Sequence, residues 1–131
     1  MSRQMTSPSV RAKKGLLYAY KTPTLGLQPF RYAYGIVFRD RGMIYDEVGH
    51  ICINAFPKDR DLFIEYFEVD ERFRVMGYGR EMYEWVEGYA RRRGMERIII
   101  YPKESAEGFW EKMGFKWSSS MLKFDMVKAL R

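Results

Sequence analysis

The most constraining feature of this sequence is a glycine-containing loop that joins a strand-like segment to a strongly periodic helical segment. A strand is predicted over residues 62–69 and a helix over residues 78–93, with Gly77 and Gly79 at their junction. Glycine lets the backbone turn sharply and approach a ligand closely. The helix directs its first unpaired N–H groups and the positive end of its dipole at the loop. This corner is therefore expected to bind an anion, above all phosphate or pyrophosphate.

Three phosphate-binding motifs could explain this corner, and two of them do not fit. A P-loop requires Gly-Lys-Ser/Thr, but Arg80 and Glu81 follow Gly79 in this chain. The dinucleotide fingerprint G-x-G-x-x-G requires a third glycine, and Met82 stands at that position. The remaining pattern is R-x-x-G-x-G, which begins at Arg74. The alternative is a plain strand-to-helix turn that uses glycine for its geometry alone.

The length favours a single domain, which is predicted over residues 15–131. Across the whole chain 47% of the residues are hydrophobic, which is enough to form a packed core. The single cysteine, Cys52, excludes an internal disulfide and fits a reducing compartment, so we expect a cytoplasmic protein. His50 and Cys52 share one strand face without a third ligand, so no metal and no nucleophile is assigned to them. The longest apolar run, residues 98–101, is too short to span a membrane, and no signal for export is seen.

The formal net charge of +6 is concentrated at the start of the chain. Residues 1–14 hold four basic residues and no acidic one, leaving 19 of the 23 basic residues against 17 acidic residues. This segment lacks periodicity and is predicted to be a disordered basic tail. Because the remaining chain is nearly balanced in charge, a solvated tail is favoured over an arm that binds nucleic acid.

The pattern along the chain predicts a mixed α/β fold. An antiparallel meander with a bulge at Gly49 precedes the glycine loop. After it, the helix and an apolar strand complete a βαβ unit. The strands expected before the loop are 16–20, 32–38, 43–56 and 62–69, and the elements expected after the helix are a strand at 97–101, a helix at 105–113, and strands at 115–117 and 121–130.

Several stretches resemble the GCN5-related N-acetyltransferase (GNAT) family in the same order and spacing. The R-x-x-G-x-G loop resembles the acetyl-coenzyme A loop of the family, and residues 106–115 resemble its A-x-x-F-Y-x-x-x-G-F corner. Residues 126–130 resemble its last strand. The resemblance implies a GNAT-like mixed, mostly antiparallel central sheet with a βαβ cofactor-binding unit. The helical region near the N-terminus would be reduced, because residues 21–31 are too short for two helices.

The resemblance also implies acetyl-CoA as cosubstrate. In the family, the fourth and fifth strands splay apart and pantetheine enters the gap. Backbone groups of Phe67 and Val69 would bind it, and an amide near Val69 would polarise the thioester carbonyl. Amides of residues 75–80 would hold the pyrophosphate. The full set of expected cofactor-binding residues is Phe67, Val69, Arg74, Val75, Met76, Gly77, Tyr78, Gly79, Arg80 and Trp110.

The implied reaction is transfer of an acetyl group to a primary amine by direct attack, which needs a base because an ammonium has no lone pair. Glu65 stands where relatives that acetylate small amines carry a glutamate, and it is the first choice of base. Glu68 is the second choice, and strand alternation predicts that its side chain points to the opposite face.

Two departures from the family leave alternatives open. The tyrosine acid of the family aligns with Trp110, whose indole cannot give up its proton near neutral pH. Tyr66, Tyr101 or water would replace it, or the thiolate would leave unassisted. The missing helical pair would leave the acceptor site more open, so a peptide, a protein or another large acceptor is an alternative to a small molecule. The alternative function is a catalytically silent adaptor that binds acyl-CoA or nucleic acid, and a homodimer stays open.

Overall fold

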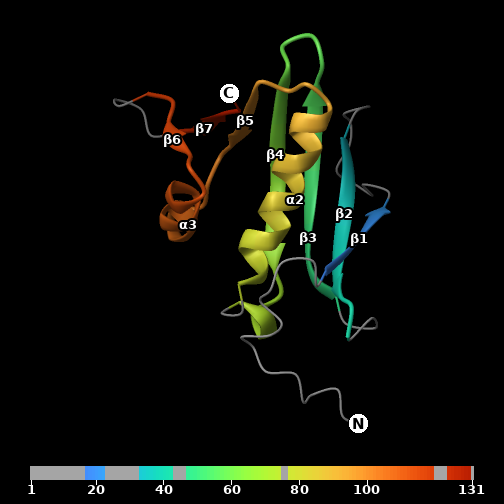
Figure 1. Cartoon of the computed structure of the whole chain (residues 1–131). Coiled ribbons are helices and arrows are strands. Elements are labelled where there is room, and N and C mark those ends of the chain that lie inside the picture. Colours follow the sequence, from blue (N-terminus) through green and yellow to red (C-terminus); the bar gives the residue numbers. More distant parts are fainter. Residues whose placement is uncertain (1–16, 23–32, 43–46, 75–76, 120–123, 131) are drawn as a thin grey trace.

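The computed structural model describes residues 17–22, 33–42, 47–74, 77–119 and 124–130. Its centre is a seven-stranded sheet with the order β1-β2-β3-β4-β5-β7-β6 (Figure 1). Neighbouring strands are antiparallel except β4 and β5, which are parallel. The strands are β1 (Leu17–Thr22), β2 (Ala33–Asp40), β3 (Glu47–Phe56), β4 (Asp61–Val69), β5 (Arg97–Ile100), β6 (Lys116–Trp117) and β7 (Met126–Ala129).

The described helices fill the two connections on either side of β5. A 3-10 turn, η2 (Glu71–Phe73), and the long helix α2 (Tyr78–Arg92) join β4 to β5. A second 3-10 turn, η3 (Glu104–Ala106), and the short helix α3 (Glu107–Lys112) follow β5. Figure 1 shows α2 lying across β3 and β4, while α3 lies with β5, β6 and β7 to one side.

The predicted mixed sheet and the βαβ unit are confirmed, with small shifts of element boundaries. The helix expected over residues 105–113 is divided into η3 and α3. The last strand is shorter than expected. Residues 1–14 and most of the segment predicted to lack two helices lie outside the described residues, so those two predictions stay predictions.

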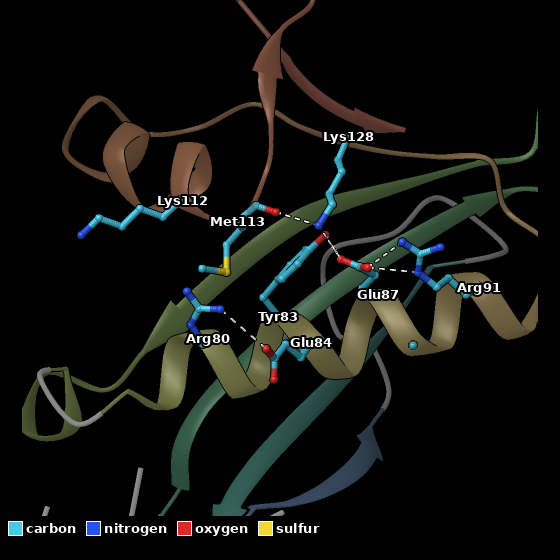
Figure 2. Close-up of a pocket in the computed structure, with 9 residues that line it drawn as sticks. Arg80, Tyr83, Glu84, Glu87, Arg91, Lys112, Met113 and Lys128 are labelled. Atoms are coloured by element: carbon cyan, nitrogen blue, oxygen red, sulfur yellow. Dashed lines mark hydrogen bonds and ion pairs between the residues drawn. The ribbon is translucent and has the colours of Figure 1, made fainter. Parts of the chain in front are cut away.

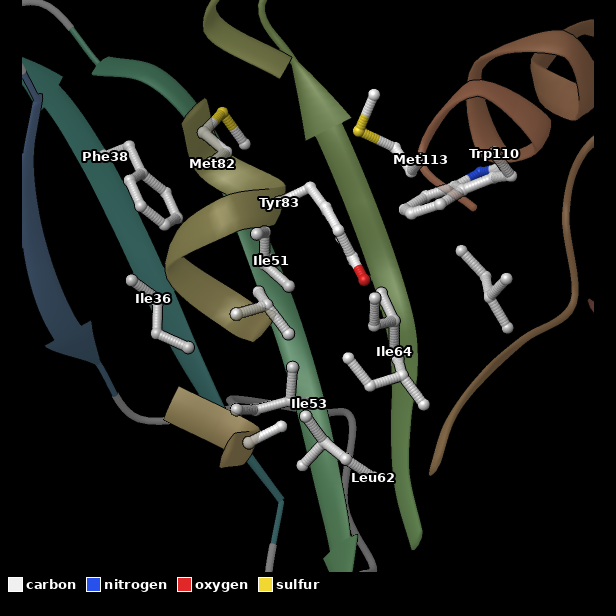
Figure 3. Packing of buried hydrophobic residues seen from close by; sticks show 14 of the residues in the cluster. Ile36, Phe38, Ile51, Ile53, Leu62, Ile64, Met82, Tyr83, Trp110 and Met113 are labelled. Atoms are coloured by element: carbon white, nitrogen blue, oxygen red, sulfur yellow. The ribbon is translucent and has the colours of Figure 1, made fainter. Parts of the chain in front are cut away.

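The core lies between α2 and one face of the sheet. On α2, Met82, Val86 and Ala90 are fully buried and share one side of the helix, as their spacing predicts. On β3 and β4, alternate residues point toward them, including Ile51 and Leu62 (Figure 3). The sheet face away from α2, here called the back face, therefore carries the other set of side chains.

A bulge next to Gly49 is confirmed. Phe38 pairs with Gly49, but Arg39 pairs with Glu47, so Val48 is the extra residue on β3. A Cβ at Gly49 would lie 2.4 Å from the carbonyl oxygen of Glu68. Glycine is therefore required there because β4 and α2 approach so closely.

The feature that positions the site is the short pairing between β4 and β5. The two strands pair only over Asp61–Ile64 on β4 and Arg97–Ile100 on β5. β4 continues to Val69, whereas the chain after Ile100 turns away. Within the part of the chain that the structure describes, the second half of β4 therefore has a free edge on the side of β5.

Candidate active site

A cleft of about 710 Å³ opens where β4 and β5 diverge. Its walls are the second half of β4, the segment after β5, α3 and the start of α2. Both predicted catalytic glutamates line it. So do the predicted cofactor-binding residues Phe67, Val69, Arg74, Gly77, Gly79, Arg80 and Trp110. Val75 and Met76 lie outside the described residues.

The inner wall of the cleft is the free edge of β4. The amide of Asp70 donates to the carbonyl oxygen of Val48 at 2.7 Å, so it points toward β3. The carbonyl of Val69 points the other way and accepts from Arg74 Nε at 2.8 Å. Because backbone groups alternate along a strand, those of Phe67 point in the same direction as those of Val69. The backbone groups of Phe67 therefore point away from β3, whereas the carbonyl of Val69 on the same edge is hydrogen-bonded to Arg74.

At the glycine corner, the N-terminus of α2 borders the cleft. Gly77 is the N-cap, with φ of 81°, and among the described residues no side chain caps the helix. A Cβ at Gly79 would lie 3.3 Å from the ring of Phe109, so the backbone here has little room for a side chain. The side chain of Tyr78 is buried and donates to Asp40 Oδ2 at 2.5 Å, so only its backbone can serve a ligand. The corner fits an anion such as pyrophosphate.

The cleft is lined by side chains of both charges. The basic ones are Arg74, Arg80, Lys103 and Lys112. The acidic ones, Glu65 and Glu68, project from β4, and Glu68 forms an ion pair with Arg74 at 3.4 Å. The cleft therefore offers cations to a phosphate group and the carboxylate of Glu65 to an ammonium group.

Glu65 lies at a bulge in β4. Ile53 of β3 pairs with Ile64, and Cys52 pairs with Tyr66, so Glu65 has no partner across the ladder. Two consecutive residues on β4 then oppose one on β3, and the alternation of side chains is interrupted at this point.

The bulge makes the predicted separation of the two glutamates wrong. Glu65 accepts from Asn54 Nδ2 at 3.4 Å, and Glu68 lies opposite His50. His50, Cys52 and Asn54 are alternate residues of β3 and share the back face. Glu65 and Glu68 therefore lie on the same face, because one extra residue changes which positions point together.

The surroundings of the two glutamates differ. Glu68 accepts a hydrogen bond from the Tyr66 hydroxyl and forms an ion pair with Arg74 at 3.4 Å. The hydrogen bond from Tyr66, aided by the nearby charges of Lys103 and Arg74, lowers the pKa of Glu68. In the described part of the chain, the exposed Glu65 is hydrogen-bonded to Asn54 alone. Glu65 therefore has fewer hydrogen-bonding and ion-pair partners than Glu68.

Trp110 is a packing residue at the wall of the cleft. Its side chain is 2% exposed, and its ring packs edge-on against Phe67, Tyr83 and Phe115 at 5.0, 5.8 and 5.2 Å. Figure 3 shows Trp110 and Tyr83 in the core. The two phenols that line the cleft are Tyr66 and Tyr101. The hydrogen bond to Glu68, together with burial, raises the pKa of Tyr66.

His50 and Cys52, to which neither a metal nor a nucleophilic role is assigned, pack against neighbouring groups. The ring of His50 stacks on Tyr66 at 4.9 Å. Cys52 is buried, and burial followed by the charge of Glu65 raises the pKa of its thiol. Among the described residues, no group of three metal-binding side chains is found, and no helix is long and apolar enough to cross a membrane.

A second cavity of about 440 Å³, here called the outer pocket, lies between α2, α3 and β7 (Figure 2). Its centre is Glu87, which accepts hydrogen bonds from Tyr83 at 2.9 Å, Lys128 at 2.7 Å and Arg91 at 2.8 Å. Lys128 also donates to the carbonyl oxygen of Met113 at 2.7 Å. The lining residues are Arg80, Tyr83, Glu84, Glu87, Gly88, Arg91, Lys112, Met113 and Lys128.

The polar groups of the outer pocket satisfy one another. Burial alone would raise the pKa of Glu87, but hydrogen bonds from Lys128, Arg91 and Tyr83 lower it to about 2. The network joins α2 to β7 and to the end of α3, so we interpret it as structural. Sequence analysis missed it because Glu87 and Lys128 are 41 residues apart.

Comparison with known proteins identifies this architecture. A model of the acetyltransferase (GNAT) family matches residues 19–115. Among curated proteins, no significant match to this sequence is found. Many solved structures match this chain, and three of them serve as examples.

The chain is similar to Tetrahymena GCN5, with 19% identity and a TM-score of 0.66 over 77% of this chain and 70% of that one. It is similar to Ard1 from Thermoplasma volcanium, with 23% identity and a TM-score of 0.61 over 74% and 70%. An IAA acetyltransferase from Bacillus cereus ATCC 14579 matches with 14% identity and a TM-score of 0.67 over 87% and 99%. At these identities, the structural likeness shows the fold alone.

Proposed function

The chain belongs to the acetyltransferase (GNAT) family, and from this premise we propose that it transfers an acetyl group from acetyl-CoA to a primary amine by direct attack. The observation that carries the proposal is the continuity of one cleft. The same cavity reaches the glycine corner of α2, the free edge of β4 and the carboxylate of Glu65. Anion binding, main-chain recognition and a base are thus available along one path.

The residues present fit acetyl-CoA. The uncapped start of α2 and the basic side chains beside it suit the pyrophosphate. The backbone groups of Phe67 on this edge suit the amides of pantetheine, which can bind as an added strand would, and a ligand at the Val69 carbonyl would share it with Arg74 or displace Arg74. The bound cosubstrate would supply an activated thioester.

Glu65 is the proposed base. An amine arrives as an ammonium and must lose a proton before its lone pair can attack. The carboxylate of Glu65 lines the cleft beside the free edge, and the amide of Asn54 orients one of its oxygens. Glu68 accepts a hydrogen bond from Tyr66 and forms an ion pair with Arg74, so we assign it a structural role at the end of β4.

The departing thiolate has no acid at the position of Trp110. The indole is buried among aromatic rings, and its N–H is a donor without useful acidity near neutral pH. Tyr66 and Tyr101 are phenols of the same cleft and are the candidates for donating a proton, with water as the third.

A turnover assay with a panel of primary amines tests this function. The purified protein is mixed with acetyl-CoA and each amine, and release of the coenzyme thiol is measured, with acetyl-CoA affinity determined by calorimetry. Thiol release that depends on the amine supports the proposal. Tight binding of acetyl-CoA without turnover of any amine would favour the silent acyl-CoA-binding adaptor instead.

A further inference from the structure

A row of four aromatic side chains lies next to the proposed base. The rings of Phe56 and Phe63 are 5.2 Å apart, those of Phe63 and Tyr101 are 6.1 Å apart, and those of Tyr101 and Phe124 are 5.1 Å apart. The residues come from the end of β3, from β4, from the segment after β5 and from the segment before β7. We call these four residues the aromatic row.

The aromatic row faces away from the core. Leu62 and Ile64 belong to the core on the α2 side of β4, so Phe63 between them lies on the back face. Phe124 is 69% exposed, Tyr101 is 52% exposed and Phe56 is 37% exposed. Contiguous exposed aromatic groups are unusual on a protein surface and are typical of a binding surface.

The aromatic row leads to Glu65. Phe63 lies two residues before Glu65 on β4, and Tyr101 lines the same cleft as Glu65. Tyr101 is therefore the ring of the row that connects it to the cleft, and Phe63 lies on the same strand as Glu65. An acceptor that combines a cationic amine with apolar groups would be complementary to both Glu65 and the aromatic row.

We propose that the acceptor is a primary amine carried by an extended polypeptide segment whose neighbouring residues are large and apolar. This inference rests on the proposed acetyltransferase function and names its acceptor class. The three ring-to-ring distances, if laid end to end, correspond to at most roughly five residues of extended chain, at about 3.3 Å per residue. A small amine would cover one or two of the rings, whereas a peptide can place its amine at Glu65 and its side chains along the row.

The chemistry of the transfer balances. One proton of the ammonium passes to Glu65 and on to solvent, the amine nitrogen forms a bond to the acetyl carbon, and the carbon–sulfur bond of acetyl-CoA breaks. The second proton lost from nitrogen ends on the coenzyme thiol. The products are an acetylated peptide and coenzyme A.

Two matched peptides test the acceptor class. Both have the same length, net charge and single lysine, with blocked termini, and the lysine is flanked by phenylalanines in one and by serines in the other. Thiol release is measured at saturating acetyl-CoA, with a short aliphatic diamine as a third acceptor. We expect kcat/KM for the phenylalanine peptide to be at least about tenfold higher than for the serine peptide.

A variant of the row and a matched control locate the effect. Phe124→Ala should bring the ratio of the two kcat/KM values close to one, because the most exposed ring is lost. Tyr20→Ala removes a 45% exposed aromatic group on β1, away from the row, and should leave the ratio unchanged. Circular dichroism checks that both variants fold.

The outcomes separate the two proposals. Turnover of both peptides at equal rates, or preference for the diamine, overturns the apolar acceptor class and leaves the acetyltransferase function standing. A preference that persists in Phe124→Ala overturns the role of the aromatic row. Binding of acetyl-CoA without turnover of any amine overturns the proposed function and this inference with it.

Discussion

The cleft and the outer pocket are both lined by ionisable side chains, and they share Arg80, Lys112 and Met113. In the outer pocket, Glu87 accepts hydrogen bonds from three side chains on α2 and β7. In the cleft, Glu65 is hydrogen-bonded to Asn54 alone among the described residues, and β4 has a free edge. Groups that already satisfy one another hold a fold together, whereas groups with remaining capacity can serve a ligand. The comparison assigns stability to the outer pocket and chemistry to the cleft.

The largest effect is expected at Glu65. Glu65→Gln keeps the shape of the side chain but removes the base, so turnover should fall by roughly 10²–10⁴-fold while acetyl-CoA affinity stays nearly unchanged. Steady-state kinetics and calorimetry measure the two quantities. Glu68→Gln, on the same face, is the matched control and should reduce turnover by less than about tenfold. The reverse order of the two variants would make Glu68 the base.

The next effect concerns the glycine corner. Gly77→Leu should weaken acetyl-CoA binding by at least about 100-fold, because a side chain would stand where the cosubstrate approaches the start of α2. Gly94→Leu is the control for backbone strain, since Gly94 has φ of 73° and nothing lies within 4 Å of its added Cβ. Gly94→Leu should lower stability but not affinity. Equal affinity in all three proteins, measured by calorimetry, would remove the cofactor role of the corner.

A substitution in the outer pocket should lower stability and leave activity nearly unchanged. Lys128→Met leaves the carboxylate of Glu87 and the carbonyl of Met113 without their shared donor, and should lower the free energy of unfolding by about 1–3 kcal/mol. Chemical denaturation measures this change. kcat/KM should stay within about threefold of the wild type, and a loss of activity with unchanged stability would contradict the structural role.

The dependence of stability on pH also tests the structural role of the outer pocket. The pKa of Glu87 is about 2 in the folded protein against an ordinary value of 4.5, so its contribution to stability is present above pH 4.5 and is lost as pH falls toward 2. Lys128→Met should make the stability profile flatter over this window, which denaturation at a series of pH values would detect. An unchanged acid slope in the variant would mean that Lys128 does not depress this pKa.

The smallest effect is expected at Trp110. Trp110→Phe should reduce turnover by less than about tenfold and keep the shape of the pH–rate profile, because the indole packs against aromatic rings and does not supply a proton. The variant should lose stability through the smaller ring. If turnover falls by more than about 100-fold with fold and affinity preserved, the indole takes part in the chemistry.

Periodicity and turn residues predicted most of the fold. The apolar stripe of the helix at 78–93 and the apolar run at 98–101 of the next strand identified the βαβ unit, because both patterns arise from burial within a single element. Gly49 indicated a bulge, since glycine in a strand often accompanies close backbone approach. These are local signals, and the structure confirms them.

The features that were not predicted from the sequence depend on contacts between separate helices and strands. The bulge at Glu65 carries no glycine and has no local signature, so simple alternation separated two glutamates that share a face. The contact between Glu87 and Lys128 joins α2 to β7 and has no spacing that a sequence pattern could show. The aromatic row likewise combines four residues from separate segments. Such features depend on tertiary packing, which single-sequence patterns do not encode.

The most direct test of the central claim is a crystal structure of the protein with acetyl-CoA bound. The comparison of the two cavities predicts pyrophosphate at the amides around Gly77 and Gly79, and pantetheine along the free edge of β4 at Phe67 and Val69. The thioester would then lie on the side of the cleft that holds Glu65. Acetyl-CoA bound in the outer pocket against Glu87 and Lys128, with the edge of β4 unoccupied, would contradict the account.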